Sequence, residues 1–157
     1  MPRNIHNRRS IIKGAAVGAA ATATNFASPA ISQDKFRWKM VTTWPKNFPG
    51  VGTTAENVAK DITKASGGRL EVKVYGSGEI VPAYEVFDAV RQGTVEIGHS
   101  WSGYWISKHP GLAYFGGIPG GLSPSEQSSW ILHGGGQKLW EEILDPYGIQ
   151  PLSLIHI

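Results

Sequence analysis

The sequence predicts an α/β fold built around a parallel sheet. Short segments alternate apolar and polar side chains at every second residue, as half-buried strands do, and a stretch with apolar residues at helical spacing separates the first two. Parallel strands need a long crossover connection, so this strand-helix-strand order predicts a βαβ unit. None of the 157 residues is cysteine, which excludes a disulfide framework, thiolate metal sites and thiol catalysis.

The first predicted unit spans residues 36–75. Residues 36–43 alternate and end in a Trp44-Pro45 turn, which predicts a strand. A capping-box pattern at Thr53–Glu56 and a stop at Gly67-Gly68 bracket a helix. The apolar face of that helix consists of Val51, Ala55, Val58, Ala59 and Ile62. Residues 70–75 alternate again and predict the second strand.

The next stretch predicts a short helix and a third strand. Pro82 opens the helix and Gly93 closes it. Residues 95–99 form the strand, and Ser100–Trp105 follow it directly. Open α/β sheets bind ligands at the carboxyl ends of their strands, so residues 100–105 are candidates for ligand contact.

The remaining residues predict mostly helix. A short strand is expected over residues 112–115, and a second capping box at Ser123–Glu126 begins a helix. Gly134–Gly136 interrupt that helix, which resumes until Pro146. Residues 149–152 are expected to begin a further strand.

The first thirty residues fit a twin-arginine export signal. Arg8-Arg9 and Lys13 precede a small, weakly apolar run, and Ser28–Ala30 match a small-x-small cleavage pattern. The run is too short and too polar for a transmembrane anchor. We therefore expect residues 1–30 to be a signal peptide and residues 31–151 to belong to the mature domain.

Removing the signal peptide removes the basic character of the chain. The sequence has 15 Lys and Arg against 12 Asp and Glu, a net charge of +3. Four of the basic residues and no acidic residue precede position 30, which leaves 11 basic and 12 acidic side chains. The mature domain is therefore nearly neutral, and we expect no nucleic-acid partner.

Several motifs resemble those of one exported family. They are Trp-Lys-Met-Val-Thr-Thr-Trp-Pro (38–45), Gly-Gly-Arg-Leu-Glu-Val-Lys-Val-Tyr (67–75), Gly-Glu-Ile-Val-Pro-Ala-Tyr-Glu-Val-Phe-Asp-Ala-Val (78–90), Gly-Thr-Val-Glu-Ile-Gly-His (93–99) and Trp-Ser-Gly-Tyr-Trp (101–105). With the twin-arginine leader, residues 36–151 resemble the solute-binding proteins of tripartite ATP-independent periplasmic (TRAP) transporters. The subgroup for 2-oxo acids and related monocarboxylates is the nearest match.

The resemblance implies a two-lobed periplasmic binding protein, of which this chain supplies only the N-terminal part of the first lobe. Such a protein is not an enzyme; it closes around a small carboxylate, such as pyruvate, and delivers it to a TRAP membrane permease. The family uses an arginine bidentate to the carboxylate, and the subgroup often adds a cation, Na⁺ or Ca²⁺, next to the ligand. We expect those groups beyond this chain, and a homodimer for the full-length protein.

The last residues suggest why the chain stops early. Leu152–Ile157 match the in-frame translation of CTG TCT CTT ATA CAC ATC, the transposon-end adapter used in short-read library preparation. We expect these residues to be a sequencing artefact at the end of an N-terminal fragment. A natural apolar strand is the alternative.

Two residues after the first strand are candidates for ligand contact. The Trp44 indole could wall an apolar part of the ligand or donate its N–H to a carboxylate, and it could equally cover the edge of the core. The Thr43 hydroxyl could bind the ligand, although its position before the Trp44-Pro45 turn favours a role in that turn.

Aromatic residues supply the other candidates. Tyr104 follows the third strand, and its hydroxyl suits a carboxylate or a 2-oxo oxygen while flanking rings exclude water. Trp101 and Ser102 are weaker candidates. A helix over residues 101–108 would turn Trp101, Tyr104 and Trp105 into a packing stripe. Tyr84 opens the short helix and either lines the cleft or covers apolar surface.

The other polar residues indicate no metal site or catalytic centre. His99, His109 and His133 lack the spacing of zinc ligands and are expected to be structural. The acidic residues of 141–145 are expected to face solvent. The sequence contains no GxGxxG, CxxC or GxSxG motif. An exported redox enzyme and a non-catalytic structural or adhesion domain remain as alternatives.

Overall fold

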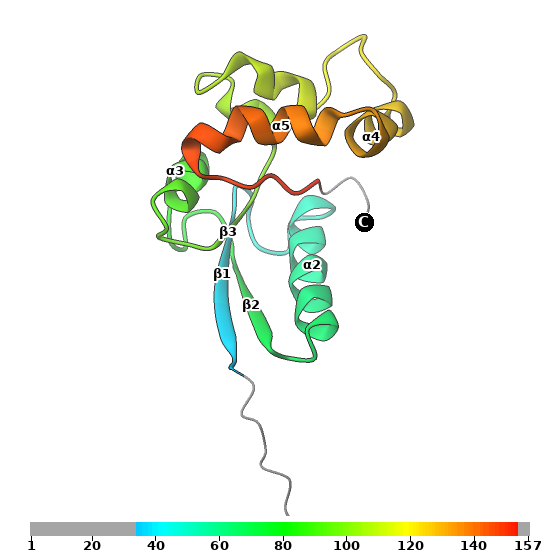
Figure 1. Cartoon of the computed structure of the whole chain (residues 1–157). Helices are drawn as coiled ribbons and strands as arrows, with labels where there is room; N and C mark the ends of the chain where they lie inside the picture. Colours follow the sequence, from blue (N-terminus) through cyan, green and yellow to red (C-terminus); the bar gives the residue numbers. More distant parts are fainter. Residues whose placement is uncertain (1–33, 154–157) are drawn as a thin grey trace, which may run out of the picture. The chain divides into compact units, whose positions relative to one another are not determined.

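Three parallel strands form the sheet of this computed structural model, which describes residues 34–153 (Figure 1). Strand β1 (Phe36–Thr42) lies between β2 (Leu70–Tyr75) and β3 (Ile97–His99). It pairs in parallel along the whole of β2, whereas β3 pairs only with the last three residues of β1, Met40–Thr42. The predicted βαβ unit and third strand are confirmed.

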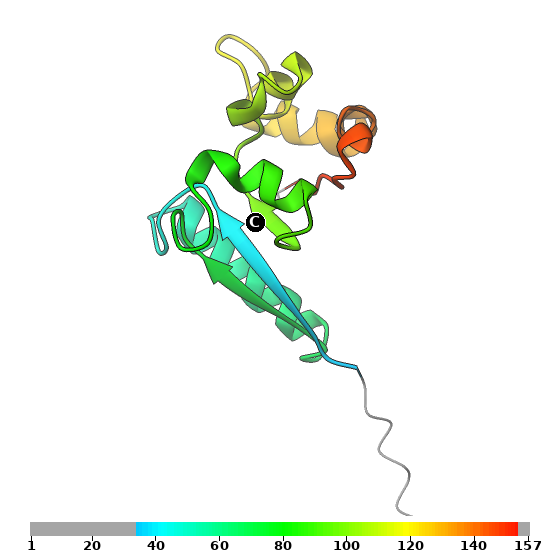
Figure 2. The same cartoon turned by 90° about the vertical axis from the view of Figure 1, so that its left-hand side faces the viewer.

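Helices cover the two faces of this sheet. Helix α2 (Val51–Ala65) lies along β1 and β2, as Figures 1 and 2 show, and its fully buried Ala55 packs with Met40. Small side chains on the buried face of α2 allow this close approach. On the other face, Val41 packs against Val86 of helix α3 (Val86–Arg91). The 3₁₀ turn η1 (Ala83–Glu85) precedes α3, as expected of a helix opened by Pro82.

The capping box predicted at Thr53–Glu56 is wrong, because it places the N-cap at Thr53, three residues after the observed N-cap, Gly50. The helix begins at Val51, and no capping box forms; Thr53 instead lies inside the first turn, and its Oγ1 donates to the Gly50 carbonyl at 2.9 Å. Gly50 has a φ of 81°, a conformation that glycine adopts without strain. This turn brings the chain from Pro45 directly into the helix.

Within residues 34–153, the secondary-structure elements that follow β3 are all helical. They comprise the 3₁₀ segments η2 (Ser102–Trp105), η3 (Pro110–Phe115) and η4 (Asp145–Tyr147), and the helices α4 (Pro124–His133) and α5 (Gly136–Leu144). Leu112, Phe115 and Leu144 join Phe87 of α3 in one buried cluster, and Phe115 stacks on Trp140 at 5.0 Å. The predicted capping box at Ser123–Glu126 is confirmed.

Two predicted strands are wrong. Residues 112–115 lie in η3, which begins when His109 Nδ1 accepts the Gly111 N–H at 3.1 Å; three-residue spacing then turns Leu112 and Phe115 to the same buried side. Residues 149–152 form no strand in the described part of the chain, because the Pro151 carbonyl accepts from the Gln137 side chain at 2.8 Å rather than from a neighbouring strand.

The first half of β1 has a partner on one side only. Strand β3 does not extend beside Lys39. Instead, the Lys39 N–H donates to the Glu96 carboxylate at 2.7 Å, and Lys39 Nζ donates to the Thr94 carbonyl at 3.1 Å. No helix within residues 34–153 is long and apolar enough to cross a membrane. The predicted signal peptide and residues 154–157 lie outside the described residues.

Candidate functional site

The carboxyl ends of β1 and β3 bring the first candidate residues together. The Thr43 N–H donates to the His99 carbonyl at 3.3 Å, which extends the β1–β3 pairing by one bond. Just beyond, Ser100 Oγ donates to Thr43 Oγ1 at 3.1 Å. Thr43 is thus held by both backbone and side chain at the sheet edge, where this fold class binds ligands.

The backbone carbonyl of Trp44 accepts two hydrogen bonds, whereas its indole N–H donates none within residues 34–153. The Trp44 carbonyl accepts from Thr42 Oγ1 at 2.6 Å and from the Ser77 N–H at 2.9 Å. Its half-buried ring meets the His99 ring edge-on, with centroids 5.0 Å apart. Trp44 Nε1 is buried and has no hydrogen-bond partner within residues 34–153. A buried donor of this kind is costly unless something accepts from it.

His99, which the sequence predicted to be structural, is a further candidate in the structure. It is 3% exposed, and neither ring nitrogen has a hydrogen-bond partner in the described part of the chain. Burial lowers its pKa from 6.5 to about 4, so the ring is neutral at pH 7 and offers one donor and one acceptor. Its position as the last residue of the third strand, next to Ser100, was the available signal.

Ser102 and Trp105 are the first and last residues of η2. Ser102 is 7% exposed, and its Oγ has no hydrogen-bond partner among the described residues. The Trp105 ring is half-buried and packs on Phe87 at 5.4 Å, and its Nε1, like Ser102 Oγ, is buried without a hydrogen-bond partner among the described residues. The hydroxyl of Ser102 therefore joins Trp44 and His99 as a polar group in need of a partner.

Three exposed aromatic rings lie side by side next to this edge. Tyr104 contacts Trp101 at 5.3 Å and Tyr84 at 5.5 Å, both edge to face. Their exposed fractions are 44% for Trp101, 41% for Tyr104 and 70% for Tyr84. Trp101 Nε1 already donates to the Gly116 carbonyl at 3.0 Å, so Trp101 offers a ligand its ring rather than its N–H.

The described residues show no metal site, and one hollow among them lies away from the candidate residues. No three His, Cys, Asp or Glu side chains within residues 34–153 gather to hold an ion. A hollow of about 410 Å³ opens between η3, α4, α5 and η4, and none of the predicted site residues lines it. Of the predicted solvent-facing acids, Glu142 and Asp145 are exposed, whereas Glu141 is half-buried and accepts from Gln137 at 2.9 Å.

The comparisons with known proteins identify the family. The model of bacterial extracellular solute-binding proteins, family 7, matches residues 40–156. The chain belongs to this family. The family 7 assignment confirms the resemblance drawn from the motifs of the sequence.

Relatives of this family 7 chain are longer than it is. It is 37% identical over 148 residues to a protein of Nostoc sp. named monocarboxylate 2-oxoacid-binding periplasmic protein, covering 90% of this chain and 40% of that one. Two crystal structures of TRAP periplasmic solute-binding proteins are similar over 74% of this chain and 36% of theirs, each with a TM-score of 0.72. The Pseudoalteromonas atlantica protein, 37% identical, has bound sodium and pyruvate, and the Colwellia psychrerythraea protein, 38% identical, has bound calcium and pyruvate.

The predicted fold is confirmed by this likeness. The α/β unit of residues 34–153 is the fold found in part of these periplasmic binding proteins, and the chain spans about 40% of the length of the Nostoc relative. The ligand contacts of Thr43, Trp44, Tyr84, Trp101, Ser102 and Tyr104 stay predictions.

Proposed function

We propose that this chain is part of the solute-binding subunit of a TRAP transporter, which captures pyruvate or another small 2-oxo acid outside the cytoplasm. The observation that supports this most is its identity of 37% and 38% to two TRAP binding proteins that hold pyruvate. The family to which the chain belongs consists of extracellular solute-binding proteins, so we propose no catalytic activity.

The proposed binding surface combines neutral donors with aromatic walls. A carboxylate or 2-oxo oxygen that leaves water needs hydrogen-bond donors, and the buried N–H of Trp44 and hydroxyl of Ser102 lack acceptors among residues 34–153. Neutral His99 adds one donor. We assign Tyr104 a direct hydrogen bond to the ligand, with Trp101 as a wall that excludes water from it.

Two further candidates have supporting roles in this proposal. Thr43 already receives a hydrogen bond from Ser100, so its own hydroxyl proton is free for a ligand oxygen. Tyr84 is the most exposed of the aromatic candidates and contacts Tyr104, which makes it a rim residue that orients the Tyr104 ring.

These donors are all neutral, so none of them balances the charge of the ligand. We propose that a second lobe supplies an arginine, and that Na⁺ or Ca²⁺ lies next to the ligand in the complete protein. The relatives with sodium and calcium support the cation. We further propose twin-arginine export to the periplasm, a TRAP permease as partner and a homodimer of the full-length protein.

The test uses the complete product of the reading frame, recovered by long-read sequencing across codon 151. The same read shows whether Leu152–Ile157 are encoded by the source DNA. Thermal or urea unfolding is then measured with pyruvate, with propionate, which lacks the 2-oxo group, and with glucose. Pyruvate at one hundred times its Kd should raise the free energy of unfolding by about 2.7 kcal/mol. Chelation followed by Ca²⁺ or Na⁺ addition tests the cation.

Each alternative predicts a different result. A redox enzyme would consume pyruvate, which one-dimensional NMR of the mixture detects. A structural or adhesion domain would unfold identically with and without every solute. The 157-residue chain by itself should bind pyruvate poorly or fold incompletely, because a two-lobed clamp needs both lobes; saturable micromolar binding by residues 31–151 would contradict that expectation.

A further inference from the structure

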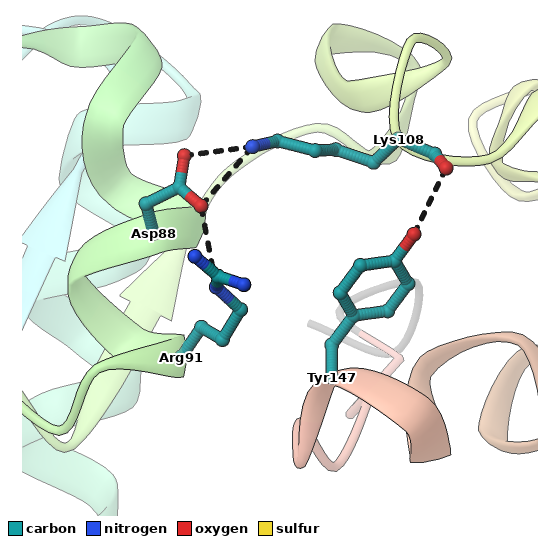
Figure 3. Close-up of polar contacts among 4 residues, drawn as sticks. All are labelled: Asp88, Arg91, Lys108 and Tyr147. Atoms are coloured by element: carbon teal, nitrogen blue, oxygen red, sulfur yellow. Dashed lines mark hydrogen bonds and ion pairs between the residues drawn. The ribbon is translucent and has the colours of Figure 1, made fainter.

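Lys108 ends the stretch that holds the exposed aromatic rings, and it is bound at three points. Its N–H donates to the Trp105 carbonyl at 2.8 Å, its carbonyl accepts from the Tyr147 hydroxyl at 2.9 Å, and its Nζ donates to both Asp88 carboxylate oxygens at 2.9 and 3.1 Å. Figure 3 shows Lys108 reaching from its loop to Asp88 on α3, with Tyr147 below. These contacts connect the Lys108 loop with α3 and η4.

Asp88 and its neighbours on α3 surround the ammonium group of Lys108. Arg91, one turn further along α3, places Nε 3.4 Å from the same carboxylate, so Asp88 keeps a cation beside it even without Lys108. The ring of Phe87 lies under Lys108 Nζ at 5.7 Å and contacts the Tyr147 ring at 5.3 Å. The two groups that bind Lys108 are therefore close to one packed cluster: Tyr147 packs on Phe87, and Asp88 follows Phe87 in α3.

The stretch between β3 and Lys108 needs such an anchor. We call residues 101–105 the aromatic segment. Within it, residues 102–105 form a single 3₁₀ turn, whose hydrogen-bond geometry is poorer than that of an α-helix. Its front end is held where Ser100 bonds to Thr43 at the edge of the sheet. Its rear end has no strand or long helix to continue into, because η3 starts only at Pro110.

We propose that Lys108 is a positioning residue for the aromatic segment: its ion pair with Asp88 and its backbone bond to Tyr147 hold Trp101 and Tyr104 in place above the strand ends. This inference rests on the proposed function, because it assigns the segment to the pyruvate site. Lys108 itself touches no ligand. Its removal loosens the segment, and ligand binding must then restore the order at the expense of affinity.

Hydrogen exchange of the complete product, measured without ligand, tests the anchor. The reporters are the amides of Tyr104 and His109, which bond to the Trp101 and Trp105 carbonyls. In Lys108→Met, which keeps the unbranched side chain and loses the charge, both should exchange about fivefold faster. Tyr147→Phe removes the other anchor and should act in the same direction. Amides of β1 should keep their wild-type rates.

Two control variants separate this role from a general loss of stability. Lys108→Arg keeps the cation and should restore slow exchange. Lys138→Met breaks an exposed ion pair to Glu142 on α5 and should leave the reporters unchanged. The proposal is overturned if Lys108→Met leaves the reporters slow, if it speeds β1 equally, or if Lys108→Arg behaves like Lys108→Met.

Pyruvate affinity of the complete product then tests the link to the site. Lys108→Met should raise the Kd about fivefold, and Lys138→Met should not change it. An unchanged Kd in a variant with a loosened segment would overturn the link between the anchor and the site. If the wild-type product binds no pyruvate, the proposed function fails, while the exchange rates still decide whether Lys108 anchors the segment.

Discussion

Acid should destabilise this protein through His99. The folded environment lowers the pKa of His99 from 6.5 to about 4, because burial disfavours the imidazolium. The unfolded chain therefore binds the extra proton first as the pH falls. The contribution of neutral His99 to the free energy of unfolding is fully present above pH 6.5 and is lost progressively as the pH falls to 4. The full loss is about 3 kcal/mol, since one pKa unit corresponds to about 1.4 kcal/mol.

The measurement is urea unfolding at pH 7 and pH 5. Over that interval the linkage relation assigns His99 a loss of about 2 kcal/mol in the free energy of unfolding. Carboxylates also titrate, so the useful quantity is the difference between wild type and His99→Phe, with His99→Gln as a second replacement. Both variants should lose about 2 kcal/mol less than wild type between the two pH values.

The control is exposed His133, replaced by Gln, which should keep the wild-type pH dependence. Equal losses in wild type, His99→Phe and His99→Gln would refute the reasoning. NMR titration of the His99 ring gives a direct check, because its apparent pKa in the folded protein should lie near 4. A value near 6.5 would mean that the ring has water or a charge partner in solution.

Three other predictions concern packing and capping. Gly116→Ala would place a methyl group 2.0 Å from Trp101 Nε1, so the Trp101 ring should move and its fluorescence emission should shift; an unchanged spectrum would contradict this. Ser123→Ala removes the cap of α4, and urea unfolding should show a loss of about 1 kcal/mol. The same variant should raise the pKa of Glu126, which hydrogen bonds from Ser123 lower, as NMR can measure. Leu112→Ala, at a 1% exposed core position, should cost about 3 kcal/mol in the same urea assay, against under 0.5 kcal/mol if the site were surface.

Periodicity predicted the strands, and the burial of β2 follows its alternation, whereas in β1 only Met40–Thr42 are buried. Met40 and Val41 point to opposite faces and pack on different helices, as alternation requires. The same reasoning failed over residues 112–115, where Leu112 and Phe115 share a buried side at a spacing of three. A run of four residues is too short for its period to distinguish a strand from a 3₁₀ helix.

The candidate site was harder to predict because it depends on contacts between distant residues. The sequence placed Thr43 and Ser100 after separate strands, but only the β1–β3 register brings them within hydrogen-bond distance. Trp101 Nε1 donates to the Gly116 carbonyl, and the His99 ring has no partner among the described residues. Both facts depend on how distant segments fold together. Neither leaves a local pattern in the sequence.

The Glu96 carboxylate that receives the Lys39 N–H has a consequence for association between molecules. Strand β1 is only half covered by β3, and an open strand edge invites pairing with another chain. Glu96 occupies the first free donor of that edge, and its charge repels an approaching strand of similar kind. A single acidic side chain thus occupies part of the open edge of the sheet at the position where its own third strand stops.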